Sequence, residues 1–387
     1  MHIPDGYLSP QTYVPAYAAM VPIWALTSAR LKKTLRQRQM PLLALGAAFS
    51  FIIMMFNVPI PGGTTGHAVG AVLIAILLGP AAATIAVSLA LIVQAVLFGD
   101  GGITAIGANC FNMAVVMPWT GWAVYRVIAG GSSAQSRRRL IAGAVGAYVG
   151  LNAAALTTAV MFGIQPLIAR GADGHALYNP FGLKVAVPVM AAEHLLVFGF
   201  VEAVVTGLVL AYLQRTDPSI IPAVTCHPKH TCHPEPTCHP ERSEGSALQS
   251  GAHTEEQILR STQNDKIVQN DKSSHRRLVR GLVIGLLLLV LLTPLGLYLP
   301  AKLGAGSAWG EWSPEEVRER VGYMPRQLQR QGSEWKAPMP DYAPHGQENA
   351  PLGRLSLFYV LSGVAGAVVV VAVSLGAGRL MRKGRDE

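Results

Sequence analysis

The first two residues, Met1 and His2, carry groups that could bind a divalent transition metal. The α-amine of Met1 has an ordinary pKa of about 8, so a metal ion can displace its proton at little cost. His2 adds an imidazole and its own main-chain amide nitrogen. These three nitrogens can occupy three corners of a square plane, which suits Ni(II), Cu(II) or low-spin Co(II) rather than Mg²⁺ or Ca²⁺. The alternative is that His2 is an ordinary polar residue near a chain end.

Two features of the N-terminal segment favour an unblocked and unprocessed α-amine. The large residue at position 2 should prevent removal of the initiator Met1. The first ten residues are polar, contain Pro and Gly, and lack the basic region that begins a signal peptide. We therefore expect Met1 to be the mature N-terminus.

The elements that must position this terminus are membrane spans. Of the 387 residues, 51% are hydrophobic and only 14% are charged, whereas soluble domains carry about 25% charged residues. The net charge of +9 comes from short basic clusters between apolar segments, which indicates membrane orientation rather than nucleic-acid binding. The sequence has no metalloprotease, phosphate-loop or dinucleotide-binding motif, so we predict neither an enzyme nor an organic cofactor.

Nine apolar segments are candidate spans on a criterion of about 20 residues. They cover residues 10–28, 40–59, 68–78, 81–98, 103–128, 140–167, 183–213, 278–299 and 355–380. Gly79-Pro80 separates the third from the fourth, which could also form one helix that is broken at the proline. The predicted fold is an all-α, polytopic helix bundle of seven spans with a two-helix C-terminal unit.

Basic clusters orient these spans, because cytoplasmic loops carry an excess of Lys and Arg. The clusters lie within residues 30–38, 137–139, 276–280 and 379–385. With nine spans all four fall on one side, whereas with eight they divide between the two sides. We therefore predict a multi-pass protein in membrane lipid, with the N-terminus outside and the C-terminus in the cytoplasm.

Three domains are predicted: a metal-binding membrane domain at 1–213, a polar cytoplasmic linker at 214–274, and a C-terminal unit at 275–387 with an external loop at 300–353. The linker cannot bury enough apolar surface to offset its chain entropy, so we expect disorder. Thr-Cys-His-Pro occurs three times in it, beginning at Thr225, Thr231 and Thr237. This repetition favours an inserted repeat without function over a cytoplasmic metal-holding segment.

His67 is the candidate for a fourth metal ligand. In the predicted topology the loop 59–67 is external, on the same side as Met1, and His67 lies where the chain re-enters the membrane. A single histidine at the start of a helix is more often a cap or a hydrogen-bonded polar group. Its position on the same side as Met1 favours a ligand.

Polar side chains inside spans are costly and therefore candidates for function. Those that could support a ligand ring or pack helices together are Gln94, Asn109, Asn112, His194 and Glu202. Small residues also recur at the spacing that lets helices approach closely. They are Ala44 and Ala48 in the second span, and Gly143, Gly146 and Gly150 in the sixth. Such stripes pack either within the chain or against a partner subunit.

Residues 1–10, Met-His-Ile-Pro-Asp-Gly-Tyr-Leu-Ser-Pro, resemble the start of the CbiM/NikM family, the substrate-specific components of energy-coupling-factor transporters for cobalt and nickel. The stretches 93–103 and 107–113, and Glu193-His194 followed by residues 201–203, are also similar to it. The likeness covers residues 1–213. It implies a seven-helix bundle that holds the metal through the N-terminal amine, the amide and imidazole of the second residue, and a histidine after the second span, here Met1, His2 and His67.

The C-terminal unit resembles CbiN or the PDGLE domain, in which two helices flank an external loop. Residues 308–316, Ala-Trp-Gly-Glu-Trp-Ser-Pro-Glu-Glu, carry this resemblance, although they depart from the Pro-Asp-Gly-Leu-Glu pattern. In the family such a unit assists metal loading or transport.

The resemblance implies import of Co(II) or Ni(II) as the transported substrate. A partner transmembrane (T) subunit and two ATPase subunits would drive the import, and Ala44 and Ala48 are the predicted coupling face. One alternative is a metal-ion channel or secondary carrier that needs no ATPase. Another is a metal-sensing membrane protein that does not transport. The sequence does not separate cobalt from nickel, because both accept the same nitrogen ligands.

Overall fold

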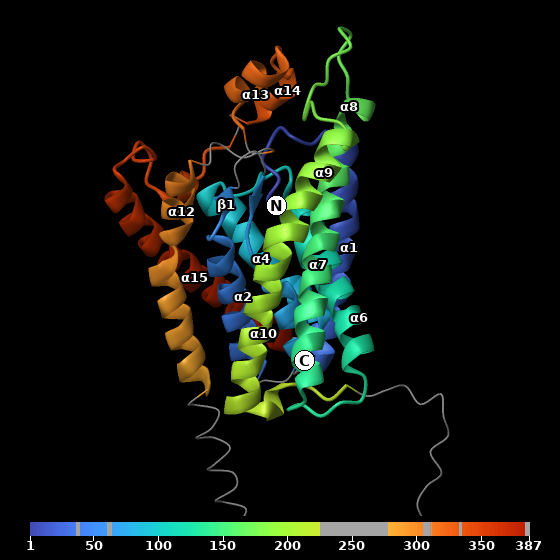
Figure 1. Cartoon of the computed structure of the whole chain (residues 1–387), viewed down its shortest axis with the longest axis vertical. Helices are drawn as coiled ribbons and strands as arrows, with labels where there is room; N and C mark the ends of the chain where they lie inside the picture. Colours follow the sequence, from blue (N-terminus) through green and yellow to red (C-terminus); the bar gives the residue numbers. More distant parts are fainter. Residues whose placement is uncertain are drawn as a thin grey trace, which may run out of the picture.

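The structure, a computed structural model, describes residues 1–35, 39–59, 64–224, 278–304, 310, 312–332 and 335–383. It is a bundle of helices with one small two-stranded sheet (Figure 1). The predicted linker repeats at 225–240 lie outside the described residues. Within these residues, five helices are long and apolar enough to cross a membrane: Pro80–Phe98, Arg137–Ile168, Leu183–Thr216, Leu278–Lys302 and Leu352–Arg379. The chain is thus a mostly helical membrane protein, and the count of nine spans stays a prediction.

The first part of the chain forms the main bundle. Its elements are α1 (Pro10–Thr34), α2 (Met40–Met54), β1 (Val58–Pro59), β2 (Thr65–Gly66), α3 (Ala71–Leu78), α4 (Pro80–Val93), η2 (Gln94–Phe98), α5 (Ile106–Asn109), η3 (Cys110–Val116), α6 (Met117–Ala129), α7 (Arg137–Gly163), α8 (Gln165–Ile168), α9 (Leu183–Glu193), η4 (His194–Phe198), α10 (Gly199–Thr216) and η5 (Pro218–Ile220). The strands β1 and β2 pair antiparallel, with Val58 opposite Gly66.

The apolar segments on either side of Gly79 form two helices, α3 and α4, which pack against each other. Gly79 has a φ of +88°, a conformation that glycine adopts without steric cost. Pro80 begins α4, where its missing N–H breaks no helical hydrogen bond. The alternative of one broken helix is therefore wrong.

Three of the apolar segments contain a π-helical stretch, η2, η3 and η4. Polar residues that the sequence analysis selected lie in these stretches: Gln94 in η2, Asn112 in η3 and His194 in η4. Wide helical turns of this kind are rare and are frequent at functional sites. They indicate that these spans are shaped for more than packing.

The small residues of α7 pack within the chain. A Cβ atom added to Gly146 would lie 2.6 Å from the carbonyl oxygen of Gly121 in α6, and one on Gly150 would lie 2.6 Å from that of Met117. The two backbones are thus in direct contact. Of the two uses predicted for this stripe, internal packing accounts for Gly146 and Gly150.

Met1 and the basic clusters lie at opposite ends of the bundle. The Ser9 amide donates to Gln165 Oε1 at 2.9 Å, at one end of the helix Arg137–Ile168. At the other end of that helix, Arg139 donates to the Tyr125 hydroxyl and the Pro222 carbonyl. At 1.5 Å of rise per residue the two ends are about 40 Å apart, enough to span a bilayer.

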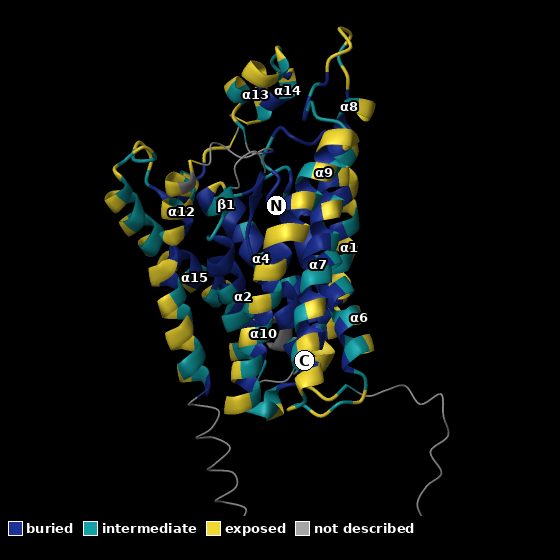
Figure 2. Cartoon of the chain, viewed as in Figure 1, coloured by how far each residue is buried: buried dark blue, intermediate teal, exposed yellow. Residues whose placement is uncertain are grey.

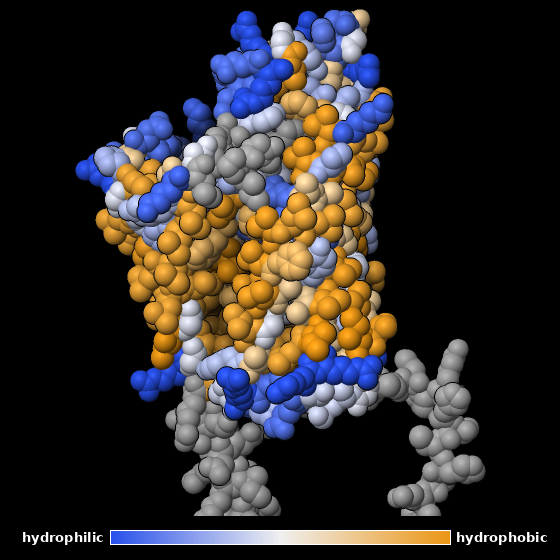
Figure 3. Space-filling view, viewed as in Figure 1, coloured by the Kyte–Doolittle hydropathy of each residue, from blue (hydrophilic) through white to orange (hydrophobic). Residues whose placement is uncertain are grey.

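The surface between these ends is apolar. Side chains such as Leu26, Val127 and Leu196 are 70%, 79% and 73% exposed, and Figures 2 and 3 show exposed, hydrophobic residues on the outer faces of the helices. Hydrophilic residues gather above and below this band (Figure 3). This is the surface expected of a protein that is surrounded by lipid.

The C-terminal part of the chain leans on the bundle and covers the end that holds Met1. It comprises the helix Leu278–Lys302, whose last part is α12 (Leu295–Leu303), then α13 (Pro314–Val321), α14 (Arg326–Gln331), η6 (Pro340–Tyr342) and α15 (Leu352–Lys383). The helix α15 packs against α2. The Gln327 amide donates to the Leu177 carbonyl at 3.0 Å, and the Met339 amide to the Leu97 carbonyl at 3.0 Å.

We predict that Gly146→Ala lowers the free energy of unfolding by about 1–3 kcal/mol, because the added methyl group forces α6 and α7 apart. Thermal unfolding in detergent micelles measures this change. Gly207→Ala in α10 is the matched control, since its Cβ would meet only the Ala144 Cβ, at 3.9 Å, and alanine favours a helix. Equal stability of the Gly146 variant and wild type would contradict the close packing of α6 on α7.

Candidate metal centre

The N-terminal residues lie inside the bundle rather than on its surface (Figure 1). The exposed fractions of Met1, His2 and Ile3 are 2%, 4% and 0%. The α-amine of Met1 donates to the Thr65 carbonyl of β2 at 3.3 Å. Burying a charged amine and a run of peptide groups is costly unless they find partners, so the structure must supply specific anchors.

Asn109 and a glycine loop anchor the main chain of Ile3. The Asn109 Oδ1 accepts from the Ile3 amide at 2.9 Å, and its Nδ2 donates to the Ile3 carbonyl at 3.2 Å. The Gly102 amide donates to the same carbonyl at 2.8 Å. A Cβ on Gly102 would lie 2.3 Å from the Asp5 amide nitrogen, so only glycine lets this loop and the N-terminal segment approach each other this closely.

The carboxylate of Asp5 binds the other side of this loop. It accepts from the amides of Ile103 and Thr104 at 2.9 and 2.8 Å, and from the Thr104 hydroxyl at 2.5 Å. The loop between η2 and α5 therefore wraps residues 3–5 from both sides. Together these contacts fix the direction in which Met1 and His2 enter the bundle.

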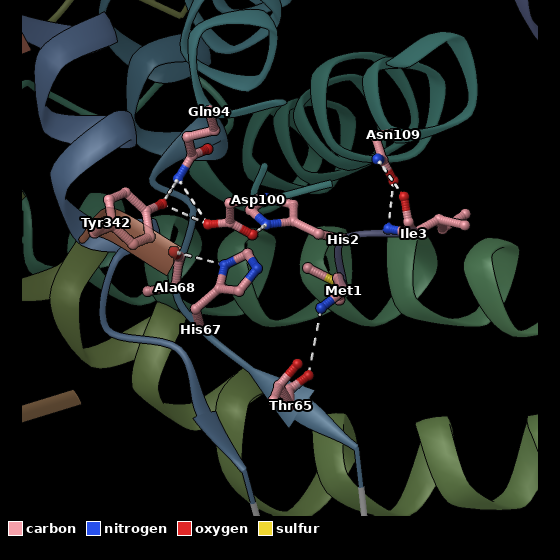
Figure 4. A network of polar contacts seen from close by, with 10 residues as sticks. All are labelled: Met1, His2, Ile3, Thr65, His67, Ala68, Gln94, Asp100, Asn109 and Tyr342. Carbon is pink, nitrogen blue, oxygen red and sulfur yellow. Dashed lines mark hydrogen bonds and ion pairs between the residues drawn. The ribbon is translucent and has the colours of Figure 1, made fainter. Parts of the chain in front are cut away.

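The rings of His2 and His67 lie side by side next to Met1 (Figure 4). Their centroids are 4.8 Å apart. The His67 Nδ1 lies 3.2 Å from the Ala68 carbonyl, which assigns the proton to Nδ1 and leaves a lone pair on Nε2. That Nε2 is buried and has no hydrogen-bond partner. The lone pair of the His67 Nε2 is therefore not used by a hydrogen bond within the described residues.

Burial holds the pKa of His67 well below its usual range, and the charges of the α-amine and His2 lower it further. The imidazole is therefore neutral at neutral pH. A neutral ring with an unused Nε2 lone pair is the form in which histidine binds a metal ion.

Asp100 links His2 to residues from two other parts of the chain (Figure 4). One carboxylate oxygen contacts His2 Nδ1, and the other accepts from the Tyr342 hydroxyl. The Gln94 Nε2 donates to the Tyr342 oxygen at 3.0 Å and reaches Asp100 at 3.4 Å. Burial alone would raise the pKa of Asp100, but the charge and hydrogen bond of His2 and the hydrogen bond of Tyr342 outweigh it, and the pKa lies below its usual value.

The structure brings Met1, His2 and His67 together, with Asn109 and Gln94 around them. No group of three or more His, Cys, Asp and Glu side chains among the described residues is placed to hold a metal ion. The candidate ligands are instead two imidazoles and main-chain nitrogens of the N-terminus.

The other selected polar residues serve different contacts. Glu202 accepts from the amides of Val69 and Gly70 at 2.7 and 3.0 Å, which holds the chain just after His67. The His194 Nδ1 lies 2.9 Å from the Met190 carbonyl, and its buried Nε2 has no hydrogen-bond partner.

Asn112 lies apart from the candidate ligands. It donates to the Thr158 hydroxyl at 2.9 Å and joins η3 to α7, as expected of interhelical packing.

Ala44 and Ala48 are buried in α2 within this chain, with exposed fractions of 3% and 0%. In this conformation a partner subunit does not reach their side chains. Their role as a coupling face stays a prediction.

Sequence reasoning missed Asp5, Asp100 and Tyr342. The two aspartates lie inside stretches that carried the family resemblance, next to glycines, and that was the available signal. Tyr342 has no such signal, since it comes from a loop 242 residues after Asp100.

Comparison with known proteins identifies the chain. Residues 2–220 match the family model described as the cobalt uptake substrate-specific transmembrane region, and residues 280–383 match the PDGLE domain. The chain belongs to this cobalt-uptake family. It is a family of transport components, not of enzymes, and the predicted resemblances of both parts are confirmed. The predicted domain boundaries at 213 and 274 stay predictions.

Relatives with both parts in one chain are similar to it over nearly their whole length. The fused nickel transport protein NikMN of Rhodobacter capsulatus is 43% identical, covering 98% of this chain and 97% of that protein. The probable fused nickel transport protein LarMN of Lactiplantibacillus plantarum is 36% identical, covering 97% of each. A crystal structure of a truncated transition metal transporter is 52% identical with a TM-score of 0.53, covering 56% of this chain and 99% of that one.

We predict that Asn109→Ala speeds hydrogen exchange of the amides of His2, Ile3 and Asp5 roughly 10- to 100-fold, because the lost contacts to Ile3 are worth about 1–3 kcal/mol. Hydrogen–deuterium exchange with mass spectrometry measures this. Asn112→Ala, three residues further along, removes an amide of the same kind away from the N-terminus and serves as the control. Unchanged exchange in the Asn109 variant would show that the anchor does not hold the segment.

Proposed function

We propose that this chain is the substrate-capture component of an energy-coupling-factor importer for Ni(II) or Co(II), and that it binds the metal with Met1, His2 and His67. The observation that carries the proposal is a buried α-amine beside two imidazoles, with the Nε2 of His67 buried and unpartnered. An all-nitrogen ligand set of this kind suits Ni(II) and low-spin Co(II). The nickel transport relatives and the transition metal transporter support the same class of substrate.

The covalent structure of the N-terminus decides which nitrogens chelate. The α-amine and the His2 amide nitrogen close a five-membered ring on a metal, and the His2 amide and Nδ1 close a six-membered ring. The Nε2 of the same histidine cannot reach that metal. The Nε2 of His67 then supplies the fourth corner of a square plane.

The His2 ring has to move for this chelation. In the structure His2 Nδ1 contacts Asp100, so metal binding at this nitrogen requires that contact to break. The α-amine and the His2 amide release protons as they bind the ion. Capture is therefore coupled to a small rearrangement of one side chain and to proton release.

The distribution of charge supports capture from outside. The described basic residues at the end of α1, the start of α7, the start of the helix Leu278–Lys302 and the end of α15 lie opposite Met1 (Figure 1). The positive-inside rule assigns that end to the cytoplasm. The N-terminus of the protein then faces the outside of a bacterial cell membrane, where metal is captured.

The partners follow from the family. A transmembrane (T) subunit and two ATPase subunits supply the energy, since the sequence has no phosphate-binding loop. To couple ATP hydrolysis to import, the metal site of the capture component must open first to the outside and then to the cytoplasm. The face of α2 that carries Ala44 and Ala48 is the proposed contact, which α2 presents once the helices that now cover it shift.

We predict that adding three glycines before Met1 weakens Ni(II) and Co(II) binding at least 100-fold, because the amine is then too far along the chain to chelate with the His2 amide. A single added glycine is avoided, because it would make the histidine the third residue and create a different square-planar set of one amine, two amides and one imidazole. His67→Ala should weaken binding by a similar factor. Isothermal titration calorimetry of the purified protein measures both. His175→Ala, on an exposed loop, is the control and should bind as wild type.

The pH dependence follows from the same ligands. Affinity should fall as the pH drops below the ordinary amine pKa of about 8, because the proton competes with the metal for the α-amine. The low pKa of His67 keeps that ring out of the competition. Undiminished binding by the extended chain would exclude the proposed site.

We predict that proteoliposomes take up radioactive nickel or cobalt only when the T and ATPase subunits and ATP are present. Vesicles with an ATPase variant that cannot hydrolyse ATP are the control. Uptake by the chain alone would favour a channel or secondary carrier. Binding without uptake in the complete assembly would favour a metal-sensing protein.

A further inference from the structure

The C-terminal unit places one residue, Tyr342, inside the metal-binding end of the main bundle. The ring of Tyr342 is 4% exposed and stacks on Phe98 of η2, with centroids 4.8 Å apart. The main chain beside it is held by the Met339 amide, which donates to the Leu97 carbonyl at 3.0 Å. The Ser362 hydroxyl of α15 donates to the Tyr342 carbonyl at 2.8 Å.

The turn that presents Tyr342 is strained. Asp341 and Tyr342 have φ values of +49° and +61°, and they are the non-glycine residues of the described chain with positive φ. Such backbone is unfavourable for a residue with a side chain and persists where surrounding contacts require it. Here the contacts on both sides of the turn hold the tyrosine against η2.

The Tyr342 hydroxyl ends in the network that reaches His2 (Figure 4). It donates to one oxygen of Asp100 and accepts from Gln94 Nε2 at 3.0 Å. The other oxygen of Asp100 contacts His2 Nδ1. A hydrogen bond to a buried carboxylate is among the stronger ones, and without it Asp100 would keep only the 3.4 Å contact of Gln94 on that oxygen.

We infer that Tyr342 is a positioning residue of the metal site, through which the C-terminal unit holds Asp100 and thereby controls the His2 ring. The inference rests on the proposed function and adds a residue to the proposed site. Asp100 and the metal compete for the same atom, His2 Nδ1. Tyr342 supplies a second partner to the carboxylate, so His2 can leave Asp100 without leaving a buried charge unpartnered.

The hydrogen bond from Tyr342 also limits how far the Asp100 carboxylate can move toward His2 and the α-amine of Met1. The α-amine of Met1 interacts electrostatically with Asp100. A carboxylate that lost Tyr342 would hold His2 more tightly or would pair with the amine. Both outcomes take a nitrogen away from the metal, so the hydroxyl favours loading.

The test is Tyr342→Phe in the full chain, titrated with nickel chloride and with cobalt chloride. We expect an affinity about tenfold lower than wild type, as for the removal of other groups that orient metal ligands, with most of the loss in the association rate. Tyr323→Phe is the matched control. Its hydroxyl accepts from the Ala176 amide at 3.3 Å, so it also joins the C-terminal unit to the bundle, but it does not touch Asp100.

A double-mutant cycle separates positioning from a general structural role. If Tyr342 acts through Asp100, the Tyr342→Phe substitution should have no further effect in an Asp100→Asn background. A full tenfold loss in that background would overturn the inference, as would wild-type affinity in the single variant. Thermal unfolding of each variant detects misfolding. If the Tyr342→Phe single variant is unstable, the affinities of the Asp100→Asn single variant and of the Asp100→Asn, Tyr342→Phe double variant are compared instead.

Failure of this inference can be told apart from failure of the proposed function. If wild type binds no metal, or if His67→Ala binds as wild type, the proposed function fails. If wild type binds and His67→Ala does not, but Tyr342→Phe binds as wild type, the positioning role alone fails.

Discussion

The structure depends on keeping a charged chain terminus and its first peptide groups buried inside an apolar bundle. Buried main-chain groups must find hydrogen-bond partners, and here side chains from distant segments provide them. Asn109 binds both main-chain groups of Ile3, Gln165 accepts from Ser9, and Asp5 binds the loop before α5. Asn109 and Gln165 are therefore explained first by the N-terminal segment that they support, and only through it by a metal.

The helices adapt to this segment. Gln94 begins η2 and Asn109 directly precedes η3, so two of the residues around the N-terminus lie where the helical turn widens. A π-helical turn inserts a residue and changes which side chains face inward. The glycine loop between these two helices then comes close enough to contact residues 3–5. The widened helical turns, the glycine loop between them and the path of the N-terminal segment therefore depend on one another.

The C-terminal unit is more than a neighbour of this arrangement. It covers the end of the bundle that holds Met1 and contributes Tyr342 to the network of Asp100. Because it is tethered in the same chain, its effective concentration at this end is high whatever the concentration of protein. The strained turn at Asp341 and Tyr342 shows that its loop conformation follows from contacts with η2 and α15 rather than from local preference.

The sequence by itself determined the membrane character, the helical segments and the nitrogen chemistry of Met1 and His2, because hydropathy and donor atoms are local properties of the chain. It did not determine which polar residues would meet. Asn109 and Asn112 are three residues apart, yet one anchors Ile3 and the other bonds to Thr158. Only the tertiary structure decided this, because the turn of a helix and the docking of distant segments set where a side chain points. For the same reason Tyr342 became part of the site only when the chain folded.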